Sequence, residues 1–341
     1  MKETSEGLIF RLHANCVPVR GARRSLICDL QYHVAHAIPN ALYEILTTLC
    51  GQSIAEIKKH YSRDEEEIID EYFDFLIEKG LGAWCDEPTR FPPLDMSWDR
   101  AEKITNAIID IDAGSSHDYR EIIVQLDGLG CQAVQIRSYD ALSVDAIHRI
   151  LAAGKGLRLR HMDLLLKYDD SITIDIVESM VIHNAIISAV TFHTSPFSKR
   201  VSLKPHPVCI SFTTAAITPQ SCGIVSPAYF SLGTEHFIEA HNYNSCLNRK
   251  LSICADGSIR ACPSMATSYG SIKETRLASV IAKQEFTQIG RITKDQVAVC
   301  RDCEFRYICT DCRAYTLNAD DPYSKPAKCT YDPYSATWRT S

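Results

Sequence analysis

The chain has 341 residues, of which 45% are hydrophobic and 23% charged, so it is long enough for two or three domains and globular in composition. Its 36 Lys and Arg against 42 Asp and Glu give a formal charge of −6, which opposes a phosphate backbone and excludes nucleic acid as an expected partner. No apolar run reaches the roughly eighteen residues of a membrane-spanning helix, and the polar start is unlike a signal peptide. We therefore expect a cytoplasmic protein with no membrane partner.

The first part of the chain predicts a small domain of strands followed by helices. Strand-like runs lie at 8–13, 25–30 and 32–38. Apolar residues at helical spacing follow between Pro39 and Gly51, and two more helices are expected to begin at the capping boxes that open with Ser53 and Ser62. With a short strand at 81–84, the order is strands, three helices and a wing.

A proline-rich linker at 88–93 separates this domain from an alternating region. Between residues 104 and 213, strand-like and helix-like runs alternate, which is typical of a parallel α/β sheet. About four or five strands are too few for a closed barrel of eight, so we expect a partial (β/α) barrel or an open sheet.

Periodicity fades from about residue 240, where cysteines become dense. We therefore expect a multidomain α/β chain with a winged-helix-like α+β domain at 1–92, a central partial (β/α) barrel at 93–240 and a cysteine-rich domain at 241–341. The small core of the last segment would need metal cross-links.

The whole chain contains fifteen cysteines. Disulfide frameworks are typical of small secreted domains, whereas this chain is long, has an odd number of cysteines and lacks an export signal. Metal ligation is therefore the better interpretation of the cysteine-rich segment.

Eight cysteines of that segment have the spacing of metal ligands. They are Cys246, Cys254, Cys262, Cys300, Cys303, Cys309, Cys312 and Cys329. Two C-x2-C pairs lie five residues apart, and each lets two thiolates reach one metal across a tight turn. Gly257 predicts a turn between two strands that would bring Cys254 toward Cys262. Zinc knuckles that only hold the C-terminus together are the alternative to a redox centre.

The arrangement Cys246-x10-Gly257-x4-Cys262, then C-x2-C-x5-C-x2-C and a final cysteine, resembles the SPASM domain of radical-SAM peptide maturases. That resemblance implies two auxiliary iron–sulfur clusters of the [4Fe-4S] type. The implied ligands of one cluster are Cys300, Cys303, Cys309 and Cys329. The implied ligands of the other are Cys246, Cys262 and Cys312, with Cys254 as a candidate fourth ligand and His241 as a weaker one. Cys254 is equally well explained as a buried strand thiol.

Radical-SAM enzymes hold their catalytic cluster with a C-x3-C-x2-C motif after the first barrel strand. The corresponding loop here, 112–118, contains no cysteine, and the glycine-rich turn that binds the cofactor's amino group is replaced by 138–140. S-adenosylmethionine is therefore not an expected cofactor, and no catalytic residue is predicted. The cysteines outside the cysteine-rich segment are predicted to be core thiols; they are Cys16, Cys28, Cys50, Cys85, Cys131, Cys209 and Cys222.

The order of strands, three helices and wing resembles the RiPP recognition element, a domain that binds leader peptides of ribosomally made precursors. A winged helix that reads DNA is the alternative, but the third helix begins with acidic residues at 64–67, which would repel phosphate. By this resemblance a leader peptide would add as a strand to the sheet edge. The candidate contacts are Tyr32, Val34, Ile38, Ile68 and Tyr72, each of which could instead belong to the domain's own core.

Three segments together, 15–29, 246–250 and 300–312, resemble the SPASM-domain peptide maturases of grasp-with-spasm systems. This resemblance covers essentially the whole chain and implies a precursor peptide and an ATP-grasp ligase as partners. Three functions follow as hypotheses: a leader-binding, cluster-carrying accessory protein of the ligase, a redox or radical enzyme that uses its auxiliary clusters, and a zinc-stabilised peptide-binding protein.

Overall fold

A computed structural model describes residues 7–339 and divides the chain into two compact units. Unit 1 consists of Met1–Trp98, Ile224–Ser245 and Ile292–Ser341. Unit 2 consists of Asp99–Gly223 and Cys246–Arg291. Each unit is therefore assembled from separate stretches of chain, and the cysteine-rich segment contributes to both.

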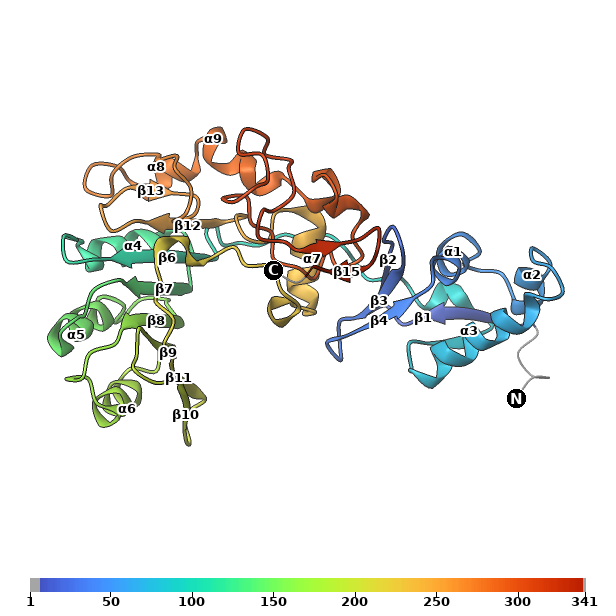
Figure 1. Cartoon of the computed structure of the whole chain (residues 1–341), viewed down its shortest axis with the longest axis horizontal. Coiled ribbons are helices and arrows are strands. Elements are labelled where there is room, and N and C mark those ends of the chain that lie inside the picture. Colours follow the sequence, from blue (N-terminus) through green and yellow to red (C-terminus); the bar gives the residue numbers. More distant parts are fainter. Residues whose placement is uncertain (1–6, 340–341) are drawn as a thin grey trace. The chain divides into compact units, whose positions relative to one another are not determined.

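Unit 2 contains a largely parallel sheet with the strand order β10-β11-β9-β8-β7-β6-β12-β13 (Figure 1). The edge strands β10 and β13 are antiparallel to their neighbours, and the other pairs are parallel. The strands are β6 (Asn106–Ile111), β7 (Ala133–Ser138), β8 (His161–Lys167), β9 (Ile187–His193), β10 (Lys199–Leu203), β11 (Val208–Phe212), β12 (Lys250–Ile253) and β13 (Ile259–Arg260).

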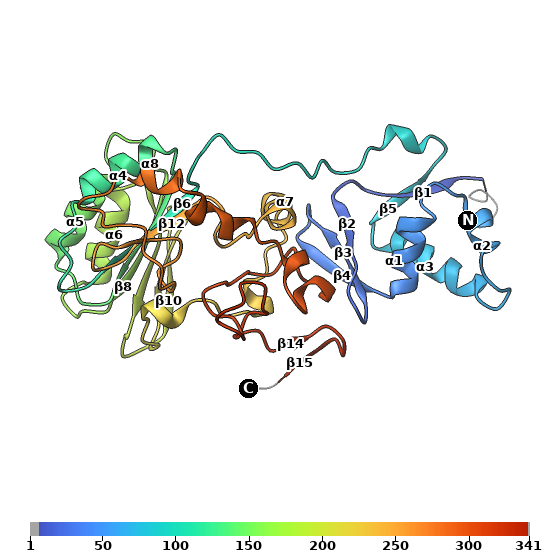
Figure 2. The same cartoon turned by 90° about the horizontal axis from the view of Figure 1, so that it is seen from above.

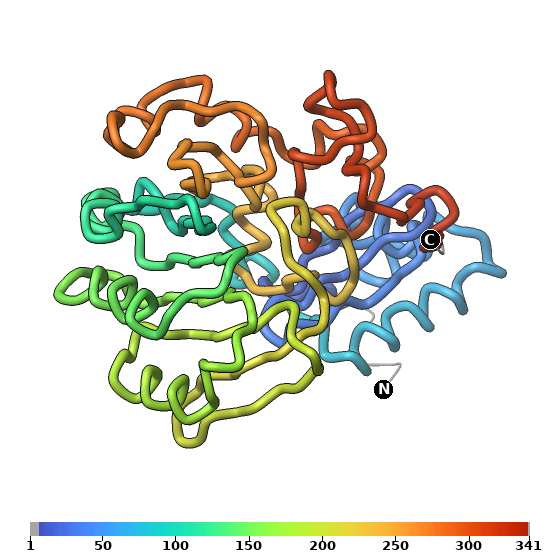
Figure 3. The backbone as a smooth tube through the Cα atoms, turned by 60° about the vertical axis from the view of Figure 1, so that its left-hand side comes forward, coloured from blue at the N-terminus to red at the C-terminus, as the bar shows by residue number. Residues whose placement is uncertain are grey.

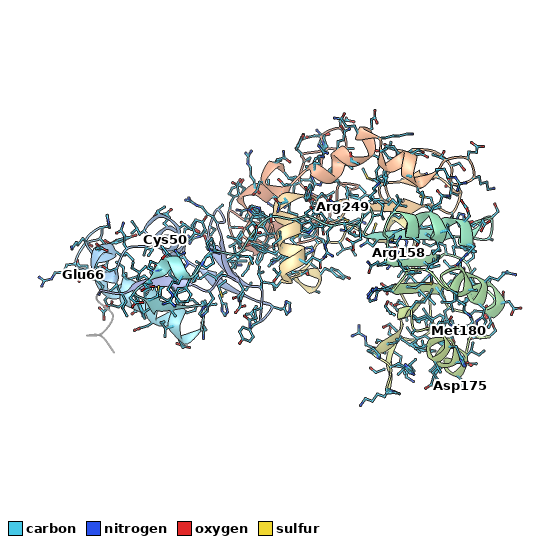
Figure 4. All side chains as sticks on the ribbon, turned by 180° about the vertical axis from the view of Figure 1, so that it is seen from behind. Cys50, Glu66, Arg158, Asp175, Met180 and Arg249 are labelled. Atoms are coloured by element: carbon cyan, nitrogen blue, oxygen red, sulfur yellow. The ribbon has the colours of Figure 1, made fainter. Side chains whose placement is uncertain are left out.

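Three helices cover one face of this sheet, as Figure 2 shows, and Figure 3 follows the backbone through the successive strand and helix turns. They are α4 (Tyr119–Gly128), α5 (Val144–Ala153) and α6 (Ile174–His183), and the shorter α8 (Leu277–Ile281) and α9 (Gln284–Thr287) follow later in the chain. Asp118, Ser143 and Thr173 cap the three long helices by accepting a backbone hydrogen bond from the residue three positions on. On α6 the buried Met180 packs into the core, whereas Asp175 in the first turn is exposed (Figure 4).

The expected α/β class with parallel strands is confirmed, but the expected number of strands was too small. Two additions enlarge the sheet. The chain forms a hairpin of β10 and β11 at one edge, and the cysteine-rich segment supplies β12 and β13 at the other. β12 pairs in parallel with β6, which places Ile253 beside Ile109. Such pairing is non-local and leaves no local sequence signal.

Unit 1 begins with two small sheets and three helices. One sheet has the antiparallel order β2-β3-β4, and β1 pairs with β5 in the other. The elements are β1 (Ile9–Leu12), β2 (Cys16–Val19), β3 (Ser25–Asp29), β4 (Val34–Ile38), α1 (Asn40–Thr48), α2 (Ile54–Lys58), α3 (Glu66–Glu78) and β5 (Gly82–Cys85). Side chains of the helices pack on one face of the three-stranded sheet, where Ile27 and Ile38 meet Leu42, Phe73 and Leu76.

Two local predictions in this region can be compared with the structure. The capping box at Ser53 is confirmed, because Ser53 and Glu56 exchange side-chain and backbone hydrogen bonds at the start of α2. The prediction that Ser62 opens the third helix was wrong: Ser62 and Glu65 bond within a turn, and α3 begins at Glu66. β2 was missed because Pro18 interrupts its pattern, yet an edge strand tolerates proline.

The other face of the three-stranded sheet is covered by segments far along the chain. Val19, Leu26 and Leu30 form one apolar cluster with Phe237 and Ile308. Phe237 lies on α7 (Thr234–Asn242), and the last strands of the unit, β14 (Tyr331–Asp332) and β15 (Thr337–Trp338), pair with each other. The central strand β3 is therefore buried on both faces within unit 1, whereas β4 is buried only at Ile38.

Within residues 7–339 the structure has no helix that combines the length and the apolar character needed to cross a membrane.

Candidate metal centres

Five predicted thiol ligands lie in unit 1: Cys312, and four others that lie on two tight turns and a later loop. The backbone N–H of Cys303 donates to the carbonyl of Cys300 at 3.0 Å, and that of Cys309 donates to Phe305, also at 3.0 Å. Cys329 follows another turn, in which its N–H donates to Pro326 at 3.1 Å. The first C-x2-C pair therefore lies on a tight turn, and Cys309 ends a second turn that begins at Phe305.

These four thiols act on one another electrostatically. Burial raises the pKa of Cys300 to about 12 and also raises the pKa of Cys303 and of Cys309. Negative charge on Cys300 and Cys309 adds to the rise at Cys303, and charge on Cys329 adds to the rise at Cys309. Cys300, Cys303, Cys309 and Cys329 thus form one group of neighbouring thiols.

A buried lysine accompanies this group. Lys294 is 4% exposed, and its Nζ donates to the carbonyl oxygens of Cys309 at 2.7 Å and Thr310 at 2.9 Å. Burial lowers the pKa of Lys294, but the negative groups Cys309, Asp311 and Cys300 more than offset it, so the pKa is raised. Lys294 therefore supplies positive charge where thiolates would otherwise repel each other. No pattern in the sequence pointed to it.

Unit 2 brings together a second set of thiols. Cys246 precedes β12 and Cys262 follows β13. The pKa of Cys262 is raised, first by a hydrogen bond with Cys222 and then by burial and by negative charge on Cys246. Cys222, which the sequence suggested was a core thiol, is therefore a neighbour of the predicted ligand Cys262.

The remaining predicted ligands occupy other surroundings. Cys254 directly follows β12, and burial raises its pKa while Ser258 and Arg260 lower it. The hairpin predicted at Gly257 is present, with a positive φ of 84° at that glycine. Cys312 is buried in unit 1 and stays a predicted ligand. His241, on α7, lies with its ring centroid 4.8 Å from that of Tyr307.

Donor chemistry suits the clusters that the sequence implies. Thiolates are the usual ligands of iron–sulfur clusters. Each cysteine sulfur binds a different iron atom of the cluster, so the sulfurs do not all surround one ion. Among residues 7–339, no three His, Cys, Asp or Glu side chains are gathered as a single bound metal ion would require. Sulfur donors suit iron–sulfur clusters or zinc rather than a hard cation such as magnesium or calcium.

The region that would hold a catalytic cluster in a radical-SAM enzyme contains a buried ion pair. Arg137 on β7 donates to both carboxylate oxygens of Asp110 on β6, at 2.6 and 2.7 Å. The hydroxyl of Tyr139 donates to the same carboxylate at 2.9 Å. Within the loop after β6, the hydroxyl of Ser115 donates to the carboxylate of Asp112 at 3.0 Å. Side chains of the protein therefore occupy the end of β6 and β7.

Predicted peptide contacts divide into exposed and buried residues. Tyr32, Val34 and Ile68 are exposed, at 72%, 43% and 45%. Ile38 is buried in the core of the unit, and Tyr72 packs partly against that core. Ile38 could therefore meet a peptide only if the core opened, which leaves the exposed three as the accessible candidates.

The prediction of core thiols holds for some cysteines and not for others. Cys16, Cys28, Cys85 and Cys131 are buried. Cys209 is half-buried, and so is Cys222. Cys50 is exposed and accepts a hydrogen bond from Arg11 at 2.7 Å, so its prediction was wrong. It follows the end of α1, where the chain turns outward.

A family model for an iron–sulfur cluster-binding domain, SPASM, matches residues 245–304. The match includes Cys246, Cys254, Cys262, Cys300 and Cys303 and ends before the later cysteines. It implies that this segment binds an iron–sulfur cluster and suggests a radical-SAM-associated protein. No curated protein matches the chain.

Proposed function

We propose that this chain is a leader-binding, cluster-carrying protein of ribosomal peptide maturation that acts with an ATP-grasp ligase. The observation that carries the proposal lies in unit 1. That single unit combines an edge strand with exposed apolar side chains and a group of four thiols. A peptide-binding edge and a cluster-binding segment in one packed unit suit a protein that handles a peptide substrate.

The edge strand is β4. It pairs with β3 on one side, and no strand of the described chain, residues 7–339, pairs with its other side. α3 lies beside β4, since the rings of His36 and Phe75 are 6.3 Å apart. An extended peptide that joined β4 would gain backbone hydrogen bonds, and its side chains would meet Tyr32 and Val34.

Each cluster, when bound, would supply one-electron transfer or a structural cross-link. Cys300, Cys303, Cys309 and Cys329 would hold the cluster in unit 1, and Lys294 would balance part of the thiolate charge. The bond-forming step is assigned to the ligase, because the sequence has no C-x3-C-x2-C motif for a catalytic cluster.

Metal analysis tests the cluster part of the proposal. The full chain, purified without oxygen, should contain about eight iron atoms and matching sulfide, as two [4Fe-4S] clusters require. Zinc in place of iron would favour the zinc-stabilised alternative and would contradict the proposal. Incubation of the reduced protein with S-adenosylmethionine should give no 5′-deoxyadenosine above a boiled control.

Peptide selection tests the leader-binding part. The full chain is presented with a displayed library of linear peptides, and enriched peptides are measured by fluorescence anisotropy. Val34→Asp should weaken binding at least tenfold, because it places a charge on the proposed edge. Val124→Asp is the matched control, since Val124 is equally exposed, at 41% against 43%, and lies in unit 2. Equal effects of the two variants, or no enriched peptide, would contradict leader binding at β4.

A further inference from the structure

Three thiols of unit 2 converge from separate places in the sequence. Cys222 lies in the loop that follows β11, just after a short 3-10 helix at Pro219–Ser221. Cys246 begins the second stretch of the unit, and Cys262 follows the hairpin of β12 and β13. Only folding of the unit brings the first of these near the other two.

The loop around Cys222 is fixed against the residues that follow Cys262. Cys222 Sγ lies 2.8 Å from Ser264 Oγ, which donates to the carbonyl of Pro219 at 2.7 Å. Cys222 and Cys246 both raise the pKa of the Cys262 thiol, Cys222 the more strongly, so both sulfurs lie near it. Three sulfurs therefore occupy one neighbourhood.

A buried cation lies close to this neighbourhood. Arg137 is 4% exposed, and Cys222 is among the negative groups that act on its guanidinium, with Asp110 and Tyr139. The bidentate contact with Asp110 already balances the guanidinium, so it places a buried polar pair beside the thiols rather than net positive charge.

Cys254 lies near the same buried carboxylate, Asp110, but burial and its own hairpin are the larger influences on its thiol. Its thiol is hydrogen-bonded to Ser258, the charged groups that act on it are Arg260, Asp110 and Asp256, and burial is the largest influence. Ser258, Arg260 and Asp256 belong to the hairpin that follows β12, whereas Asp110 lies on β6. Cys222 is therefore a better candidate than Cys254 for the fourth ligand of this cluster.

We infer that Cys222 is a ligand of the same iron–sulfur cluster as Cys246 and Cys262, and that Cys222 rather than Cys254 is its fourth ligand. This inference rests on the proposed function, in that it requires the chain to bind clusters.

The experiment compares single variants of the full chain after anaerobic reconstitution with iron and sulfide. Cys222→Ala should lose about half of the iron, one of two clusters, with loss of one component of the Mössbauer spectrum. Cys254→Ala and Cys209→Ala, a half-buried thiol on β11, should keep the iron content and spectra of the unaltered chain. Far-UV circular dichroism checks that each variant folds. If Cys222→Ala does not fold, Cys222→Ser is used in its place.

A chemical readout separates ligation from a structural role. Iodoacetamide should label Cys222 only after the iron is chelated, because a bound thiolate is protected. A Cys222 variant with unchanged iron and spectra, or loss of the same cluster in Cys254→Ala, would overturn the inference while the proposed function stands. An unaltered chain that binds no iron would overturn both.

Discussion

Among single residues, Glu304 has an unusual position, since its side chain is fully buried in unit 1. Arg24 Nε donates to its carboxylate at 2.8 Å, and the hydroxyl of Tyr331 donates to the same oxygen. The neighbouring backbone adds a bond from the N–H of Ala22 to Asp302 at 2.7 Å. These contacts tie the start of β3 to the cysteine-bearing turn at Cys303.

Arg24→Met should destabilise the protein, because it leaves a buried carboxylate without its cation. We expect a loss of about 1–3 kcal/mol in the free energy of unfolding, measured by urea titration. Arg20→Met is the matched control: Arg20 pairs with Glu44 at 3.1 Å, but both side chains are at least half exposed, so the loss should stay below about 1 kcal/mol. Similar losses for the two variants would contradict the role of Glu304.

Asp110→Asn should destabilise the protein more than Arg24→Met, since it leaves the guanidinium of Arg137 buried without its ion partner. Breaking a buried pair from one side costs about 3–5 kcal/mol. Glu121→Gln, which removes an exposed pair with Arg276 in the same unit, should cost less than about 1 kcal/mol. Denaturant unfolding followed by circular dichroism measures both, and an Asp110→Asn variant as stable as Glu121→Gln would refute the expectation.

Residues of the candidate sites were predictable where their spacing is local. The group of Cys300, Cys303 and Cys309 could be recognised because these cysteines belong to two C-x2-C pairs only five residues apart. Cys222 and Lys294 could not, since their contacts depend on loops that meet only in the folded unit. A faint signal existed for Cys222, which precedes Gly223 in a polar loop rather than an apolar run.

At the scale of elements, short helices depend on their caps. α2 has only five residues, and Ser53 with Glu56 supplies both halves of its capping box. Ser53→Ala should therefore cost about 0.5–2 kcal/mol of stability. Ser62→Ala should cost less, because Ser62 bonds to Glu65 in a turn ahead of α3. Urea unfolding of the two variants tests this order, and the reverse order would show that the turn matters more.

Helices and parallel strands of unit 2 could be predicted from the sequence because caps and apolar periodicity are local. Strand pairing is not local. The sequence could not show that β12, from the cysteine-rich segment, pairs with β6 some 140 residues earlier. The pairing of Lys250 with Asn106 requires that the outer side of β6 is free to bind another strand.

At the scale of the whole molecule, each compact unit is packed from segments that are far apart in the sequence. The N-terminal sheet has an apolar face made of Val19, Leu26, Cys28 and Leu30, all at most 2% exposed. Their partners Phe237 and Ile308 lie more than two hundred residues later. The predicted division at 1–92, 93–240 and 241–341 stays a prediction about sequence segments, whereas the compact units are discontinuous.

Removal of residues 1–92 should therefore disable the cluster in unit 1. A chain of 93–341 would expose Phe237 and Ile308 and lose the partner of Glu304, so we expect loss of about half of the iron and rapid cleavage near Cys303 in limited proteolysis. Iron analysis and mass spectrometry of the fragments check this. A truncated protein with full iron and unchanged cleavage would show that the C-terminal segment folds alone.

The discontinuity of unit 1 also sets an order of events during synthesis. Because chains leave the ribosome from the N-terminus, β2, β3 and β4 are made long before Tyr307 and Ile308, which cover their apolar face. The whole of Asp99–Gly223 emerges in between. The nascent chain thus carries an uncovered sheet for most of its translation, and a general chaperone that shields apolar surface should raise its yield in the cell.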